Sequence, residues 1–96
     1  MTVEGHAVIS PDILARYAAD AARAVDGIDD LVPSQLHRHR GVRVLDGRVE
    51  LHVRVAWGAS IPEVGREVRE RVADYLHSMA NAEFAVDVVV DEVASP

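Results

Sequence analysis

The sequence predicts a single small α+β domain in which two helices pack on one face of a mostly antiparallel sheet. Three stretches predict this class: strict apolar–polar alternation over residues 42–57, an amphipathic helix directly after it, and a second alternating run over residues 84–91. With a short strand and a helix near the start, the elements follow one another as β-α-β-β-α-β, the order of ferredoxin-like folds. Strand order stays open, and a sheet dominated by three strands is the alternative topology.

Length and composition indicate one domain over residues 1–96, with an ordered core over about residues 5–93. The chain has 49% apolar and 27% charged residues, which is typical of globular proteins, and its lack of cysteine excludes disulfides and thiolate zinc sites. No signal peptide or membrane-spanning run is visible, so we expect a cytoplasmic protein without direct membrane insertion. The net charge of −6 disfavours broad binding to nucleic acid or anionic lipid.

The first elements are a short strand over residues 6–9 and a helix that begins after Ser10 and Pro11. Serine before a proline is typical of an N-cap followed by the first helical position. Gly27 is placed where a left-handed residue would end the helix. The apolar stripe of this helix consists of Ile13, Leu14, Tyr17, Ala18, Ala21 and Val25.

A hairpin follows around the two-residue turn Asp46-Gly47, because this dipeptide suits the positive φ angles of tight hairpin turns. That turn sets the register of the two strands. The predicted pairs are Val42 with Leu51, Arg43 with Glu50, Val44 with Val49 and Leu45 with Arg48. The valines and leucines of residues 42–55 then alternate with charged residues, so we expect one buried and one solvated face.

The central helix begins at a predicted capping box of Ser60 and Glu63, with Pro62 in its first turn. Its predicted apolar stripe is Ile61, Val64, Val68, Val72, Tyr75, Leu76 and Met79. Just before it, we expect Trp57 to close the end of the core. The alternative is that Trp57 floors a shallow pocket for an anion or ligand at the helix N-terminus.

Residues 28–40 read as a long connection that ends in the basic stretch His37, Arg38, His39 and Arg40. Two histidines without a further ligand do not complete a metal site, so we expect a solvated basic loop, with a local anion or partner contact as the alternative. Arg43 and Arg54 are further cations on the predicted solvated face of the sheet. The candidate partner-binding residues are therefore His37, Arg38, His39, Arg40, Arg43 and Arg54.

Residue patterns that carry catalysis are missing, because Ser10 and Ser60 are explained as helix caps and the glycines are isolated turn residues. The carboxylates fit exposed positions, and we interpret His52 as a surface histidine on the polar face of its strand. The sequence therefore predicts a protein that is not an enzyme and has no cofactor and no metal ion.

Three segments together resemble the alkaline shock protein family, the envelope stress response proteins of Gram-positive bacteria. They are the strand-serine-helix-glycine pattern from Gly5 to Gly27, the step from Trp57 and Gly58 into the central helix, and the closing run over residues 84–90. The similarity extends over about residues 5–93. Departures are the turn at residues 79–82, where a threonine-glycine pair is usual, and the absence of lysine-rich extended termini.

The resemblance implies a non-catalytic cytoplasmic protein that self-associates and, in some members, sits beneath the membrane through a small membrane-anchor protein. We expect a homo-oligomer that is recruited to the envelope by such a partner, because Leu45 and Val89 also lie on the outer face of the predicted sheet. A small RNA-binding or ligand-binding module is the alternative. The strands carry no aromatic set for stacking bases, so nucleic acid binding is the less favoured of these functions.

Overall fold

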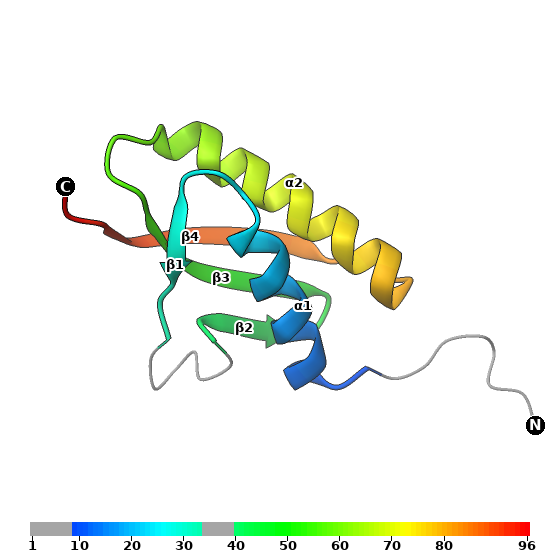
Figure 1. Cartoon of the computed structure of the whole chain (residues 1–96). Coiled ribbons are helices and arrows are strands. Elements are labelled where there is room, and N and C mark those ends of the chain that lie inside the picture. The colour runs from blue at the N-terminus through cyan, green and yellow to red at the C-terminus, as the bar shows by residue number, and fades with distance from the viewer. Residues whose placement is uncertain (1–8, 34–39) are drawn as a thin grey trace, which may run out of the picture.

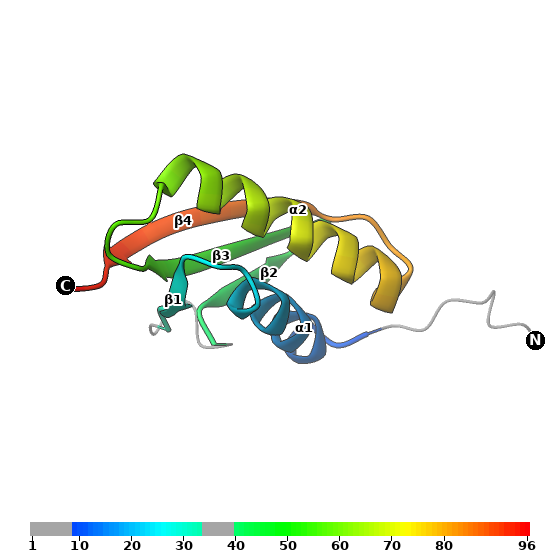
Figure 2. The ribbon, with the colours of Figure 1, turned by 45° about the horizontal axis from the view of Figure 1, so that its top comes forward.

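The computed structural model describes residues 9–33 and 40–96, and it confirms an α+β domain with two helices on one face of a mostly antiparallel sheet (Figure 1). The order of elements in these residues is α-β-β-β-α-β. Figure 2 shows both helices on the same side of the sheet. The elements are α1 (Pro11–Arg23), β1 (Ile28–Leu31), β2 (Val42–Leu45), β3 (Arg48–Val55), α2 (Ile61–Ala80) and β4 (Ala85–Val93).

Strand β3 is the centre of the sheet, because each of the other three strands pairs with it. β4 runs parallel to β3 along its whole length, from Arg48 to Val55. β2 pairs antiparallel with the first half of β3, and β1 pairs antiparallel with its last residues. β1 and β2 therefore share the edge of β3 that lies opposite β4, placed end to end.

The hairpin of β2 and β3 has the predicted register, with Val42 opposite Leu51 and Leu45 opposite Arg48. Gly47 has a φ of 71°, as the tight turn requires. Val42, Val49 and Leu51 are fully buried against the helices. The turn and the one-sided apolar pattern therefore specify the same pairing, as the sequence predicts.

One expectation about the first half of the chain is wrong, and another falls mostly outside the described residues. Residues 28–31 were expected in a connection, but they form strand β1. Two consecutive aspartates are poor strand formers, and the pairing with Val53 to Val55 outweighs this local preference. The predicted first strand over residues 6–9 lies outside the described residues except for Ile9, which is not in a strand.

The helix ends differ in how they are capped. The Ser10 hydroxyl accepts a hydrogen bond from the Ile13 amide at 3.2 Å, so the first cap is confirmed. Ser60 has an extended backbone but makes no side-chain cap bond, so the predicted capping box with Glu63 is wrong. Asn81 ends α2 in the left-handed region with a φ of 53°.

Replacing Ser10 with alanine should lower the free energy of unfolding by about 1 kcal/mol, because the Ile13 amide then loses its acceptor. The matched variant is Ser60→Ala, which removes a hydroxyl that makes no cap bond and should cost less than about 0.5 kcal/mol. Urea unfolding followed by far-UV circular dichroism measures both. Equal losses in the two variants would contradict the assignment of the caps.

The core lies between the sheet and the two helices. α1 contributes mostly alanines, and their small size allows α1 to lie close to α2 and to β2. α2 buries Val64, Val68, Val72 and Leu76, a narrower stripe than predicted. Ile61, Tyr75 and Met79 remain exposed, although the Tyr75 ring meets that of Tyr17 edge to face at a centroid distance of 5.9 Å. Apolar side chains are therefore left on the surface of α2.

Candidate functional site

The outer face of the sheet, opposite the helices, carries a set of paired charges and is the first candidate site. No helix of the described residues covers this face (Figure 2). The side chains of β3 that point to it are Arg48, Glu50, His52 and Arg54. Strands β1, β2 and β4 supply their partners.

His52 lies at the centre of this face and is only 8% exposed, so the interpretation as a surface histidine is wrong. Its Nε2 is 2.9 Å from Glu50 Oε1, and its Nδ1 is 2.9 Å from Asp91 Oδ2. An ionised carboxylate only accepts hydrogen bonds, so both ring nitrogens donate here only when the imidazole carries both protons. The ring therefore acts as a cationic bridge between β3 and β4 in that state.

His52→Ala should lower the free energy of unfolding by about 2 kcal/mol, because it removes both bonds and leaves two half-buried carboxylates close together. Arg43→Ala is the matched control. It removes a longer pair, at 3.9 Å, between the exposed Arg43 side chain and Glu50, and should cost less than about 0.5 kcal/mol. Urea unfolding at pH 6 compares them. A loss no larger than that of Arg43→Ala would show that the bridge contributes little.

A β-bulge allows two consecutive acidic residues to reach the same face. Val53 is opposite Val90 but the next residue, Arg54, is opposite Glu92, so Asp91 is the extra residue of β4. Asp91 bonds His52, and Glu92 accepts a hydrogen bond from Arg54 at 3.2 Å. Consecutive residues of a regular strand would point to opposite faces.

Arg54 is held between two strands. Its Nε donates to Asp29 Oδ2 on β1 at 2.6 Å, and Nη1 donates to Glu92 on β4. These two hydrogen bonds, first that of Asp29, raise the pKa of the Arg54 guanidinium. Nearby on β1, the Leu31 amide and then the Arg23 side chain bond Asp30 and lower the pKa of its carboxyl. Arg23 and Arg54, at this end of the sheet, therefore both form ion pairs within the domain.

The candidate partner-binding residues fall into separate places. His37, Arg38 and His39 lie outside the described residues. Arg40 is exposed, with a φ of 60°, and it precedes β2. Arg43 and Arg54 both lie on the outer face, but Arg43 pairs with Glu50, whereas Arg54 belongs to the cluster with Asp29 and Glu92.

The base of the connection between β1 and β2 is closed at His52. The Val32 amide donates to the His52 carbonyl at 2.8 Å, and the His52 amide donates to the Gly41 carbonyl at 2.9 Å. A Cβ on Gly41 would lie 2.9 Å from the Val32 nitrogen, so only glycine permits this approach. The connection between β1 and β2, which carries the basic stretch, therefore begins and ends at the backbone of His52. Sequence reasoning missed this link, because these backbone bonds join His52 to residues far from it in the chain.

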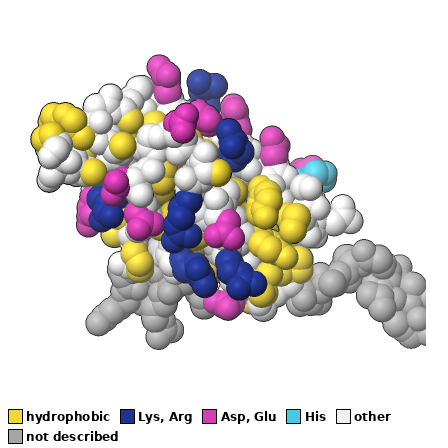
Figure 3. Space-filling model, in the orientation of Figure 1, with side chains coloured by type: hydrophobic (Ala, Val, Ile, Leu, Met, Phe, Trp, Pro, Cys, Tyr) yellow, Lys and Arg dark blue, Asp and Glu magenta, His cyan; other side chains and the backbone are white. Residues whose placement is uncertain are grey.

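Trp57 does not close the core, because its side chain is 65% exposed in the turn between β3 and α2. Val25, Val55 and Val64 are buried at that end of the core and fill it. Figure 3 shows apolar side chains gathered at the end of the molecule where α2 begins, and Trp57 and Ile61 are the large exposed ones there. Trp57 is therefore a surface feature of the domain.

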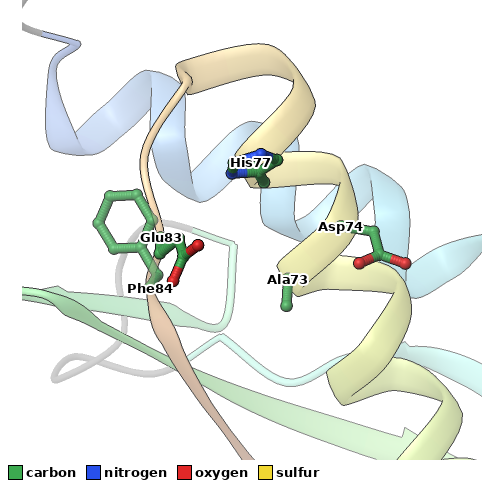
Figure 4. A pocket seen from close by; sticks show the side chains of 5 residues that line it. All are labelled: Ala73, Asp74, His77, Glu83 and Phe84. Atoms are coloured by element: carbon green, nitrogen blue, oxygen red, sulfur yellow. The ribbon is translucent and has the colours of Figure 1, made fainter.

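A hollow of about 250 Å³ lies between α2 and the segment that enters β4 (Figure 4). Its lining includes the exposed side chains of Asp74, His77 and Glu83, with Phe84 on one side. In Figure 4 Asp74 points away from Glu83, so the polar groups do not converge. Within the described part of the chain no three histidine, aspartate or glutamate side chains are grouped as metal ligands would be.

A second hollow of about 230 Å³ lies between the two helices and is mostly apolar. It is lined by Ala21, Ala24 and Tyr75 together with the charged side chains of Asp20 and Arg71. Figure 3 shows an apolar area between α1 and α2. We call this hollow the helix groove.

Comparison with known proteins shows the fold. No family model and no curated protein matches the chain. Among solved structures, a His-to-Ala variant of MamM-CTD is similar with a TM-score of 0.56 at 12% identity, over 90% of this chain and 100% of that one. A second His-to-Ala variant has a TM-score of 0.54 at 13% identity, over 88% and 98%. A nickel form of MamM CTD has a TM-score of 0.52 at 12% identity, over 84% and 96%. At this identity the likeness concerns the α+β fold alone.

Proposed function

We propose that this chain is a non-catalytic scaffold domain of the alkaline shock family, which self-associates and is recruited to the cell envelope from the cytoplasm by a protein partner. The family assignment is supported by the sequence resemblance. The observation that supports an interaction role is the number of large apolar side chains on the surface of so small a domain. They are Leu45, Trp57, Ile61, Tyr75, Met79 and Val93.

Most of these side chains fall into two groups. Trp57, Ile61 and Val93 lie at one end of the sheet, where β3 and β4 finish and α2 begins. Tyr75 and Met79 continue along α2. Concentrated apolar side chains with a rim of charge are typical of protein contact surfaces. The polar clusters of the outer face, by contrast, are ion pairs that hold strands together, which favours a structural role for them over a catalytic one.

A protein partner explains recruitment to the envelope better than direct contact with lipid. The net charge of −6 repels an anionic leaflet. No helix in residues 9–33 and 40–96 is both long and apolar enough to cross a bilayer. RNA binding has less support, because the four described strands contain no phenylalanine, tyrosine or tryptophan, and their one histidine, His52, is buried. A small membrane-anchor protein is the partner that the family resemblance implies.

The test uses the purified chain and three kinds of membrane. It should sediment with native envelope membranes of the source cell, lose this binding when the membranes are first treated with protease, and fail to float with liposomes of anionic lipid. Protease treatment removes a protein receptor but leaves the lipid surface. Equal binding to treated membranes and to liposomes would contradict recruitment by a protein.

A further inference from the structure

The described residues form an exposed apolar projection and, elsewhere on the surface, a mostly apolar hollow. The projection is Trp57, with Ile61 and Val93 beside it at the same end of the sheet. The hollow is the helix groove between α1 and α2. Figure 3 shows apolar side chains in both places, at the start of α2 and between the helices.

We propose that Trp57 of one copy inserts into the helix groove of a second copy. This inference rests on the self-association proposed above and assigns it to specific residues. An indole ring fits a hollow of about 230 Å³. Ala21 and Ala24 line the groove, where their small side chains leave room for the ring, and Tyr75 adds an aromatic side chain to the lining.

The polar lining of the groove suits an indole in particular. Trp57 has one N–H donor, and a buried indole N–H needs an acceptor. Asp20 supplies a carboxylate to the lining, where its present partner is Arg23 at 3.6 Å, a distance that leaves acceptor capacity. Arg71, which pairs with Glu67 at 3.3 Å, also lines the groove, where its guanidinium can stack on an aromatic face.

Trp57 cannot reach the helix groove of its own copy. Trp57 precedes α2, whereas Arg71 and Tyr75 lie ten and fourteen residues after the first residue of that helix. At 1.5 Å per residue the groove is about 15–20 Å along the axis from the start of α2, farther than a tryptophan side chain reaches. The projection and the groove are different surfaces, so each copy can engage two neighbours, and the contact generates rings or open chains.

The chemistry at the projection favours a second copy over a membrane. Glu63 is in the first turn of α2 and the chain has a net charge of −6, whereas Asp91 and Glu92 just before Val93 are paired with His52 and Arg54. An anionic lipid surface would be repelled there. The lining of the groove, with one carboxylate and one guanidinium, presents no such repulsion.

The intrinsic tryptophan fluorescence of the protein reports on this contact, because Trp57 is its single tryptophan. As the concentration of the wild-type protein rises, Trp57 emission should shift to shorter wavelength and become protected from acrylamide, in step with a rise in mass by sedimentation velocity. Trp57→Ala should weaken association by about 30-fold or more, as expected for a buried aromatic anchor. Ala24→Arg fills the groove at an exposed position and should weaken association equally.

Mixing the two variants gives the sharpest result. Trp57→Ala retains its groove and Ala24→Arg retains its projection, so the mixture should form one-to-one pairs and nothing larger. Leu45→Ala and Ala82→Arg change exposed residues outside both surfaces and should associate as the wild type does.

The remaining outcomes separate this inference from the proposed function. If Trp57→Ala and Ala24→Arg both associate as strongly as the wild type, the insertion of Trp57 is wrong but self-association stands. If the wild type stays monomeric up to about millimolar concentration, both are wrong. If Trp57 emission shifts with anionic liposomes and not with protein concentration, the end of the sheet binds lipid and the inference is overturned.

Discussion

Leu51→Ala should lower the free energy of unfolding by about 3–4 kcal/mol, the largest loss we expect from one truncation of a side chain. Leu51 is 0% exposed on the central strand, with Val42 opposite it on β2 and Val88 on β4. Removal of its terminal carbons loses buried apolar area and leaves a cavity that three paired strands cannot close by shifting. A domain of this size is stabilised by only about 5–15 kcal/mol, so the variant would lose a large share of its stability.

The control for this variant is Leu45→Ala, in the same hairpin. Leu45 is 38% exposed, so the same chemical change should cost less than about 1 kcal/mol. Urea unfolding followed by far-UV circular dichroism gives both values, and unchanged slopes of the transitions would show that the unfolded states are comparable. Similar losses for the two leucines would contradict the assignment of the core to one face of the hairpin.

Gly27→Ala should cost about 3 kcal/mol for a different reason. Gly27 has a φ of 96°, where a residue with a Cβ is strained, and an added Cβ would lie only 2.6 Å from Val64 Cγ2. Val64 is buried and β-branched, so it cannot rotate away without displacing the start of α2. The expected loss therefore combines backbone strain with overpacking.

Gly58→Ala separates these two causes. Gly58 has a similar φ of 85°, but nothing lies within 4 Å of its added Cβ, so this variant should lose only about 1 kcal/mol from backbone strain. A further test is Val64→Ala in the Gly27→Ala background, where removal of the clashing methyl groups should cost less than it does in the wild type. Additive losses would contradict the clash.

The parts of the fold that local rules specify could be predicted from the sequence. The Asp46-Gly47 turn and the alternating pattern determine the hairpin register, and Ser10 before Pro11 marks the start of α1. β1 could not be predicted, because Asp29 and Asp30 disfavour a strand and only pairing with β3 orders them. Long-range pairing of this kind has no signal within a short window.

The candidate site was less predictable for the same reason. Alternation indicates which face His52 occupies but not how much its neighbours cover it, and Asp91 reaches His52 only because of the bulge in β4. Trp57 continued an inward-facing row in the sequence, yet the row ends at Val55 and the chain turns outward after it. A pattern cannot locate the residue at which a sheet stops being covered.

The closed base of the β1–β2 connection makes this part of the chain a natural place for insertions. Both ends are tied to the main chain of His52, through Val32 and Gly41, so added residues between them leave the pairing of β1 and β2 with β3 unchanged. Each doubling of such a loop costs only about 0.6 kcal/mol in closure entropy. An extra residue in the two-residue turn of the hairpin would instead move a whole strand to the other face. A peptide graft inserted between Val32 and Gly41 should therefore leave the pairing of β1 and β2 with β3, and the core behind it, as they are.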